Sequence, residues 1–352
     1  MHDLVVIGAG ISGLRVADLA VAAGLDVVVL EARDRVGGRL RSVATDGGAV
    51  DLGATWFWAG ERHVTELIED LAIPTHAQHL AGDAMYHDPN QMRRIDGNPI
   101  DVASGRFSGG AQQLAERLAA RLPEGTVHLN RPATAVHEAP DRLTVLTADA
   151  PVDTRHVVLA LPPSLAAHAI DFVPPLPEPL GGLARSTPVW MGAIVKVVAV
   201  YPTAFWRTAG LAGAAISHIG PMREIHDMSG PDGAPAALFG FAPLMQPDQP
   251  APTEEQVLHQ LVELFGPEAA EPRELHLADW RAEPHTSPPG AELLRAYQTY
   301  GHPLWADAAM AGRLHWSSTE TSPVNPGHID GALASAHRVA TTIINERTTN
   351  GA

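Results

Sequence analysis

The 352-residue chain contains no cysteine, and Lys196 is its single lysine beside 23 arginines. The absence of cysteine excludes disulfides, thiolate metal sites and cofactor links through sulfur. The histidines are scattered, and no His-x-x-x-His pair stands among helical carboxylates, so we expect no metal site. The sequence also lacks a nucleophile elbow and any internal repeat. The sequence is therefore that of an ordinary globular chain, and any chemistry must depend on features other than thiols, metal ions or a nucleophile elbow.

The charge balance is acidic. The formal net charge of −16 disfavours nucleic acid and anionic membranes as partners. The same charge attracts cationic amines weakly, although an acidic soluble protein is the simpler interpretation. With 45% hydrophobic residues, the chain can bury a large core and form two lobes. An apolar strand follows Met1 almost at once without a basic leader, so we expect a cytoplasmic protein.

A βαβ pattern occupies the first 31 residues. An apolar run of strand length, residues 4–7, leads into the glycine turn Gly8-Ala9-Gly10-Ile11-Ser12-Gly13, and a helical stretch follows to Ala23. A second apolar strand ends at Glu31, where a carboxylate can accept hydrogen bonds from a ribose. The glycines allow a tight turn, close approach to a pyrophosphate and helix–strand packing, and the helix N-terminus favours phosphate. We predict a dinucleotide site here rather than a glycine-rich turn without a ligand.

The segment after Glu31 indicates which dinucleotide is bound. Residues 32–40 place the glycine pair Gly37-Gly38 and Arg39 just past the second strand, an arrangement that a nicotinamide enzyme does not need. This segment resembles the flavin amine oxidase family, the FAD enzymes that include monoamine and polyamine oxidases. The resemblance implies that the glycine pair brings backbone close to FAD and that Arg39 contacts its phosphates. It also implies that residues 51–56 run beside the isoalloxazine ring.

Lys196 stands in the middle of an apolar run, residues 193–201, that is typical of a strand covered on both faces. An unpaired ammonium there would be costly or would lose its proton. The lysine therefore either lies on an edge strand or points into a wet cavity. The resemblance favours the cavity. In the family, a lysine that precedes a Phe-Trp pair holds a water against the reactive nitrogen of the flavin, and Lys196 precedes Phe205-Trp206 with that spacing.

The C-terminal part resembles the closing motif of the family. Residues 314–321 match its strand, and residues 327–332 match the start of a helix whose N-terminus points at the flavin. Within this motif, Glu320 lies where the family bonds the ribityl and phosphate region, and Trp280 matches a tryptophan near the ring.

Three residues depart from the family pattern. Ser318 replaces a glycine, and Asp330 replaces a glutamate. His328 replaces a tyrosine of the aromatic cage that surrounds the amine in monoamine oxidases, and the region of the second cage residue, around His285, has no tyrosine. Either the two histidines replace the aromatic pair, or the substrate is not a simple arylalkylamine.

The resemblance implies an α/β fold in which an FAD-binding, Rossmann-like domain of the GR2 type is interleaved with a smaller α+β substrate domain. We place the FAD-binding domain in residues 1–60, 105–165 and 275–347, the substrate domain in 61–104 and 166–274, and a flexible tail in 348–352. The proline-rich stretch 162–179 is expected to cross between the lobes. The implied catalytic residues are Lys196, His328 and Trp280. The implied cofactor-binding residues are Gly8, Gly10, Ile11, Ser12, Gly13, Glu31, Ala32, Arg33, Gly38, Arg39, Leu40, Ala54, Thr55, Trp56, Val136, Trp280, Glu320, His328, Ile329 and Ala332.

The resemblance also implies the activity. We expect an FAD-dependent amine oxidase that oxidises a C–N bond of a primary or secondary amine to an imine and reduces O2 to hydrogen peroxide. A flavin desaturase or isomerase with a non-amine substrate is the alternative, and a flavoprotein that serves as a binding partner is a third interpretation. Some monoamine oxidases attach FAD through cysteine, which this chain lacks, so noncovalent FAD is expected. The C-terminus has no apolar tail like that of membrane-bound monoamine oxidases, so we expect no membrane partner; a homodimer is compatible with the sequence.

Overall fold

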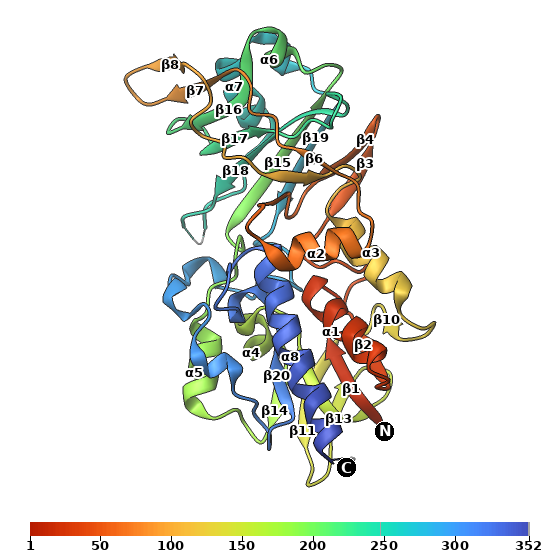
Figure 1. Ribbon diagram of the computed structural model, residues 1–352. Helices are drawn as coiled ribbons and strands as arrows, with labels where there is room; N and C mark the ends of the chain where they lie inside the picture. Colours follow the sequence, from red (N-terminus) through yellow and green to blue (C-terminus); the bar gives the residue numbers. More distant parts are fainter. Residues whose placement is uncertain (247, 351–352) are drawn as a thin grey trace.

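The computed structural model describes residues 1–246 and 248–350, with the side chains of residues 348–350 excepted. The chain forms two lobes, and both termini lie in the lower lobe of Figure 1. A large sheet lies in each lobe, and two small sheets accompany them. The order of the elements shows that the chain passes between the lobes more than once, as an interleaved two-domain α/β fold requires.

The lower lobe contains an eight-stranded sheet in the order β10-β2-β1-β13-β12-β11-β14, and β20 pairs with β13. Its strands are β1 (His2–Ile7), β2 (Val27–Leu30), β10 (Val127–His128), β11 (Ala133–Glu138), β12 (Leu143–Thr147), β13 (Val152–Leu159), β14 (Asp171–Val173) and β20 (Leu314–Trp316). The helices of this lobe are α1 (Ile11–Ala22), α2 (Arg62–Asp70), α3 (Gln112–Arg121), α4 (Pro163–Ala169), α5 (Glu178–Ser186) and α8 (Ile329–Asn350).

Strand β1 is buried on both faces, which explains its continuous apolar sequence. Leu4 and Val6 pack in the cluster that contains the apolar sides of α1, α3 and α8. Val5 and Ile7 face the opposite cluster, which contains Trp316 of β20. Parallel strands covered on both sides require apolar residues at every position.

The upper lobe contains a seven-stranded sheet in the order β19-β15-β18-β17-β16-β7-β8. Its strands are β7 (Asp83–His87), β8 (Met92–Ile95), β15 (Ile194–Tyr201), β16 (Leu211–Ser217), β17 (Glu224–Asp227), β18 (Ala236–Pro243) and β19 (Glu274–Asp279), with helices α6 (Phe205–Thr208) and α7 (Glu254–Phe265). The small sheets pair β3 (Ser42–Thr45) with β4 (Gly48–Asp51), and β9 (Gly105–Phe107) with both β5 (Trp56–Phe57) and β6 (Thr75–Ala77). Five short 3-10 turns complete the described elements: Pro267–Ala270, Ala291–Leu293, Tyr297–Thr299, Pro303–Ala306 and Thr319–Thr321.

The proline-rich stretch 162–179, which was expected to cross between the lobes, stays with the lower lobe. It contains α4, and β14 pairs in parallel with β11 of the lower sheet. The prolines start helices instead of breaking them, since α4 and α5 each carry a proline in the first turn, where no intrahelical N–H is needed. At the start of α7, Thr253 and Gln256 form a capping box.

The predicted domain boundaries and the sheets do not coincide everywhere. Elements β14 and α5 lie in the range predicted for the substrate domain, but they belong with the lower sheet and its core. Strand β19 begins at the predicted start of the third FAD-binding segment, but it pairs with β15 of the upper sheet. Helix α8 continues to Asn350, through part of the predicted tail, and residues 351 and 352 lie outside the described residues.

Candidate active site

A cavity of about 710 Å³ is lined by both lobes. It extends from the glycine turn and the end of β2 to the face of the upper sheet that carries Lys196. The predicted site residues that line it are Gly8, Gly10, Ile11, Ser12, Glu31, Ala32, Arg33, Gly38, Arg39, Leu40, Ala54, Thr55, Trp56, Lys196, Trp280, His285, His328, Ile329 and Ala332. The three predicted site residues that do not line it are Gly13, Val136 and Glu320.

The glycine turn is held by backbone contacts that a side chain would disrupt. Gly8 has φ +107°, and a Cβ there would lie 2.7 Å from the carbonyl oxygen of Ala160. A Cβ on Gly13 would lie 2.0 Å from the carbonyl oxygen of Gly8, so Gly13 lets α1 pack against the turn beneath the cavity. Gly10 differs, because its Cβ would meet Gly37 only at 4.0 Å and would otherwise enter the cavity. The turn therefore presents open backbone and the positive end of α1 to the cavity.

Glu31 holds the loops around the end of the cavity at the glycine turn, which we call the nucleotide end after the predicted dinucleotide site. Its Oε2 accepts the N–H of Ala9 at 2.7 Å, and its Oε1 accepts the N–H of Arg33 at 2.9 Å. The residue is 4% exposed and lines the cavity. One carboxylate thus fixes the glycine turn to the loop after β2, and its remaining lone pairs can accept hydrogen bonds from a ribose.

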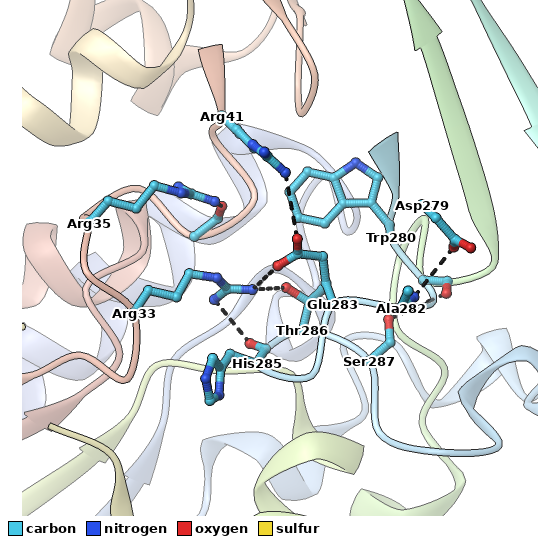
Figure 2. A network of polar contacts seen from close by, with 12 residues as sticks. Arg33, Arg35, Arg41, Asp279, Trp280, Ala282, Glu283, His285, Thr286 and Ser287 are labelled. Carbon is cyan, nitrogen blue, oxygen red and sulfur yellow. Dashed lines mark hydrogen bonds and ion pairs between the residues drawn. The ribbon is translucent and has the colours of Figure 1, made fainter. Parts of the chain in front are cut away.

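Arg33 holds a distant segment beside this loop (Figure 2). It donates to the Glu283 carboxylate at 3.2 Å, to the Thr286 hydroxyl at 2.7 Å and to the backbone carbonyl of His285 at 3.2 Å. Arg41 lies 3.5 Å from the other Glu283 oxygen. We define these residues as the Arg33–Glu283 network. Because Arg33 has these partners, it positions segment 283–286 at the cavity, and the exposed His285 is part of that segment.

Arg39 and Glu320 form a bidentate ion pair. Their contacts are 2.6 Å from Nη1 to Oε1 and 3.0 Å from Nη2 to Oε2. Burial alone would raise the pKa of Glu320, but the charge and hydrogen bonds of Arg39 hold that pKa below its usual value. Glu320 is fully buried and thereby orients Arg39, which does line the cavity. Contact between Arg39 and cofactor phosphates remains a prediction.

Val136 lies in the core of the lower lobe rather than at the cavity surface. The cavity wall nearest to it in sequence is formed by Pro132, Ala133 and Thr134. Contact between its backbone and an adenine also remains a prediction.

Lys196 is buried at the centre of the cavity floor. Strand β15 lies between β18 and β19, so the lysine is not on an edge strand. Directly opposed residues of neighbouring antiparallel strands point to the same face, and one such row contains Lys196, Phe241 and Glu224. All three line the cavity.

The ammonium of Lys196 is paired with groups from the segment that follows β4. It donates to the carbonyl oxygen of Gly53 at 2.8 Å and to the Thr55 hydroxyl, and it lies 4.4 Å from the centre of the Phe239 ring. Burial lowers the pKa of Lys196 to about 7; Asp51 partly offsets this effect and Arg106 adds to it. The lysine can therefore change its charge near neutral pH, as groups at functional sites often do.

Two tryptophans fix the segment that carries Thr55. Trp280, which is 5% exposed, donates its indole N–H to the carbonyl oxygen of Leu52 at 2.9 Å. Trp56 donates to Gln78 at 2.9 Å and packs against Phe239 with ring centres 5.0 Å apart. Both tryptophans therefore help to fix the position of this segment, and both also line the cavity.

His328 directly precedes α8 and contacts two residues that the sequence analysis did not select. Its Nδ1 lies 2.5 Å from Oε1 of Glu61, and its ring packs against Trp58 with centres 4.8 Å apart. Glu61 stands at the N-terminus of a polar helix, where an acidic residue usually only complements the helix dipole. No sequence signal connects it to a histidine 267 positions away.

Within residues 1–246 and 248–350, no cluster of three or more histidine, aspartate or glutamate side chains is arranged to hold a metal ion. Among the same residues, no helix is both long enough and apolar enough to cross a membrane.

Comparison with known proteins identifies a family model. The model described as "Flavin containing amine oxidoreductase" matches residues 11–105 and 91–344. The probable flavin-containing monoamine oxidase A of Dictyostelium discoideum is 25% identical, and the alignment covers 97% of each chain. The putrescine oxidase of Kocuria rosea is also 25% identical, with 100% of this chain and 97% of that protein covered. The first alignment spans 455 positions against the 352 residues of this chain, so that relative has segments that this chain lacks.

Solved structures have the same fold. A putrescine oxidase bound to putrescine superposes with a TM-score of 0.84 over 98% of this chain and 99% of that chain, at 24% identity. Cyclohexylamine oxidase from Brevibacterium oxydans gives a TM-score of 0.85 over 99% of both chains, at 22% identity.

Proposed function

The chain belongs to the flavin-containing amine oxidoreductase family, and on this premise we propose that it is an FAD-dependent amine oxidase. It oxidises a C–N bond of a primary or secondary amine to an imine, and O2 is reduced to hydrogen peroxide. The observation that carries the proposal is the buried ammonium of Lys196, held by Gly53 and Thr55 in the cavity that begins at the glycine turn.

The residues present fit noncovalent FAD. The glycine turn leaves room for a pyrophosphate at the N-terminus of α1, and Glu31 stands where a ribose would lie. Arg39, oriented by Glu320, supplies a cation for the phosphates. The start of α8, at Ile329 and Ala332, brings a second positive helix end to the cavity. FAD bound there would accept a hydride equivalent from the carbon beside the amine nitrogen and pass the electrons to O2.

The chain's own side chains orient the reactants and exclude water. The ammonium of Lys196 donates to Gly53 and Thr55 and has one further N–H to donate. A water bound to that N–H would face residues 53–56, the segment that the family resemblance places beside the flavin ring. Trp56, Trp58, Trp280 and Phe241 give the substrate end of the cavity an aromatic lining that suits the hydrocarbon part of an amine. Glu224 adds a carboxylate to the same wall, and the neighbouring His226 lowers its pKa, so an anion faces the substrate space.

The test is the visible spectrum of the purified protein. A bound flavin should absorb in the blue, and anaerobic mixing with primary amines, polyamines and amino acids should bleach it with at least one amine. Admission of O2 should restore the colour and release hydrogen peroxide in equal amount to the amine consumed. A colourless preparation that takes up no FAD would contradict the cofactor assignment.

The second candidate is a flavin desaturase or isomerase with a non-amine substrate. The observation that favours it is His328, which stands where the family's aromatic cage has a tyrosine. A flavin that remains yellow with every amine but is reduced by a non-amine compound would support this candidate instead.

A further inference from the structure

We propose that His328 and Glu61 form a proton-accepting pair that deprotonates the substrate ammonium before the amine is oxidised. This inference rests on the proposed amine oxidase function. Alkylamines resemble the lysine side chain, so at neutral pH they arrive almost entirely as R–NH3⁺. Only the neutral amine has a nitrogen lone pair that can assist loss of a hydride from the adjacent carbon. A pocket that oxidises amines at neutral pH therefore needs a group that accepts one proton.

The hydrogen bond between the two residues determines which ring nitrogen is available. Nδ1 of His328 lies 2.5 Å from Oε1 of Glu61. An ionised carboxylate can only accept, so Nδ1 carries the proton and Nε2 is the nitrogen that can take another. The His328 side chain is 37% exposed and lines the cavity, whereas that of Glu61 is 6% exposed and does not line it. The base thus faces the substrate, and its carboxylate partner is shielded behind it.

Two segments hold His328 in place: residues 58–61 contact its ring, and Thr319 holds its backbone. The second oxygen of Glu61 accepts the backbone N–H of Trp58 at 3.0 Å, and the Trp58 ring packs against His328. The Thr319 hydroxyl donates to the carbonyl oxygen of His328 at 2.8 Å. A base oriented by a third group, which is itself held in place, is the arrangement that efficient proton transfer requires.

The proposed step moves one proton and no electrons. An N–H bond of the ammonium breaks, an Nε2–H bond forms, and the new positive charge lies beside the Glu61 carboxylate. The neutral amine stays in the cavity.

Four other charged groups near the pair have hydrogen-bond or ion-pair partners of their own: Asp330 accepts from Val64 and Asn325, Glu320 pairs with Arg39, Arg62 pairs with Glu66, and Lys196 donates to Gly53 and Thr55. His63 differs, because its ring packs on His337 but its buried Nδ1 has no hydrogen-bond partner among the described residues. Two N–H groups of Lys196 are already held by Gly53 and Thr55, whereas the His328 side chain is 37% exposed and lines the cavity, so His328 is the acceptor that we assign.

Anaerobic stopped-flow reduction of the flavin tests the proposal across a range of pH. With an alkylamine at neutral pH, His328→Asn and Glu61→Gln should each slow flavin reduction about 100-fold, a typical loss for a general base. Both should move the rise of the rate toward alkaline pH. With a fluorinated amine that is already neutral at that pH, the same two variants should slow flavin reduction less than about threefold, because this amine has no proton to give up. Glu66→Gln removes an exposed carboxylate from the same helix and should change neither rate.

Nitrogen NMR of histidine-labelled protein gives a second reading that needs no turnover. The signal assigned by its loss in His328→Asn should show a neutral ring protonated at Nδ1. It should become an imidazolium when the site is saturated with tert-butylamine, which has no hydrogen on the carbon beside nitrogen. An unchanged signal at saturation, or equal slowing of both amines in His328→Asn, would overturn the inference. If no amine reduces the wild-type flavin, the proposed function itself has failed.

Discussion

The two ends of the cavity are built in different ways. At the nucleotide end, much of the cavity lining comes from one stretch, residues 8–40, and Arg33 joins the segment 283–286 to it. The polar side chain that organises this end is Glu31, which holds the N–H groups of Ala9 and Arg33. Most of the structure here is specified by glycine positions and one carboxylate.

At the substrate end, side chains face the cavity, and they come from segments far apart in the sequence. Thr55, Lys196, Trp280 and His328 meet there, each held by a partner from another segment. The difference supports the proposal that cofactor binding depends mainly on local backbone geometry, whereas catalysis depends on tertiary contacts. Substitutions at the two ends should therefore fail in different ways.

The largest expected effect is at the nucleotide end. In Gly13→Ala the new Cβ would lie 2.0 Å from the carbonyl oxygen of Gly8, so the variant should lose nearly all bound FAD and some of its stability. Gly10→Ala is the matched control, because its Cβ meets no described atom closer than 4.0 Å. The FAD-free Gly10→Ala protein should keep the thermal midpoint of the FAD-free wild type. The variant should nevertheless bind FAD more weakly than the wild type does. Full flavin content in Gly13→Ala would break the comparison.

At the substrate end, Lys196→Met should leave FAD bound and slow catalysis. Loss of the ammonium at the cavity floor should reduce the rate of flavin reduction or of its reoxidation about 100-fold, a typical loss for a group that handles a proton. Stopped-flow absorbance separates the two half-reactions, and the flavin-to-protein absorbance ratio checks cofactor content. Unchanged rates in both half-reactions would remove Lys196 from the mechanism.

The same variant should alter stability in a pH-dependent way. Burial lowers the pKa of Lys196 to about 7 from 10.5, so between these values the unfolded chain binds more protons than the folded chain. The penalty for the buried charge is complete below pH 7 and disappears as pH rises through this window. Lys196→Met removes this penalty but also loses the hydrogen bonds to Gly53 and Thr55. The net result should be a gain of about 3 kcal/mol in the free energy of unfolding of the FAD-free protein at neutral pH. Denaturant unfolding should show this gain fading at alkaline pH, and a gain independent of pH would contradict the shift.

The smallest expected effect concerns the Arg33–Glu283 network. Because the Glu283 side chain is 29% exposed, Glu283→Gln should cost only about 0.5 kcal/mol and lower the thermal midpoint by about 1 °C, less at high salt. Glu178→Gln removes an exposed partner of Arg185 and serves as the control, with no measurable change expected. A loss of FAD in Glu283→Gln as severe as that in Gly13→Ala would show that this network, and not backbone alone, holds the nucleotide end.

Much of the site could be predicted because its motifs are local. Gly8, Gly10 and Glu31 are related by the fixed geometry of one βαβ unit, and the spacing along the chain specifies their positions in space. For Lys196, the apolar strand alone left an edge position and a cavity position open, and the family resemblance favoured the cavity. The prolines of residues 162–179 suggested a crossing between the lobes, but prolines are also favoured in the first turn of a helix, where α4 and α5 carry them, and composition does not distinguish the two uses.

By itself, the sequence determined the dinucleotide turn, the exclusion of thiol chemistry and the family resemblance. Only the tertiary structure decided that Lys196 meets Thr55, that Glu320 is used to orient Arg39, and that Glu61 lies behind His328. The physical reason is the range of the interactions. Backbone geometry is set by neighbouring residues, whereas the charge and orientation of a buried side chain are set by whichever distant groups the fold brings within hydrogen-bond distance.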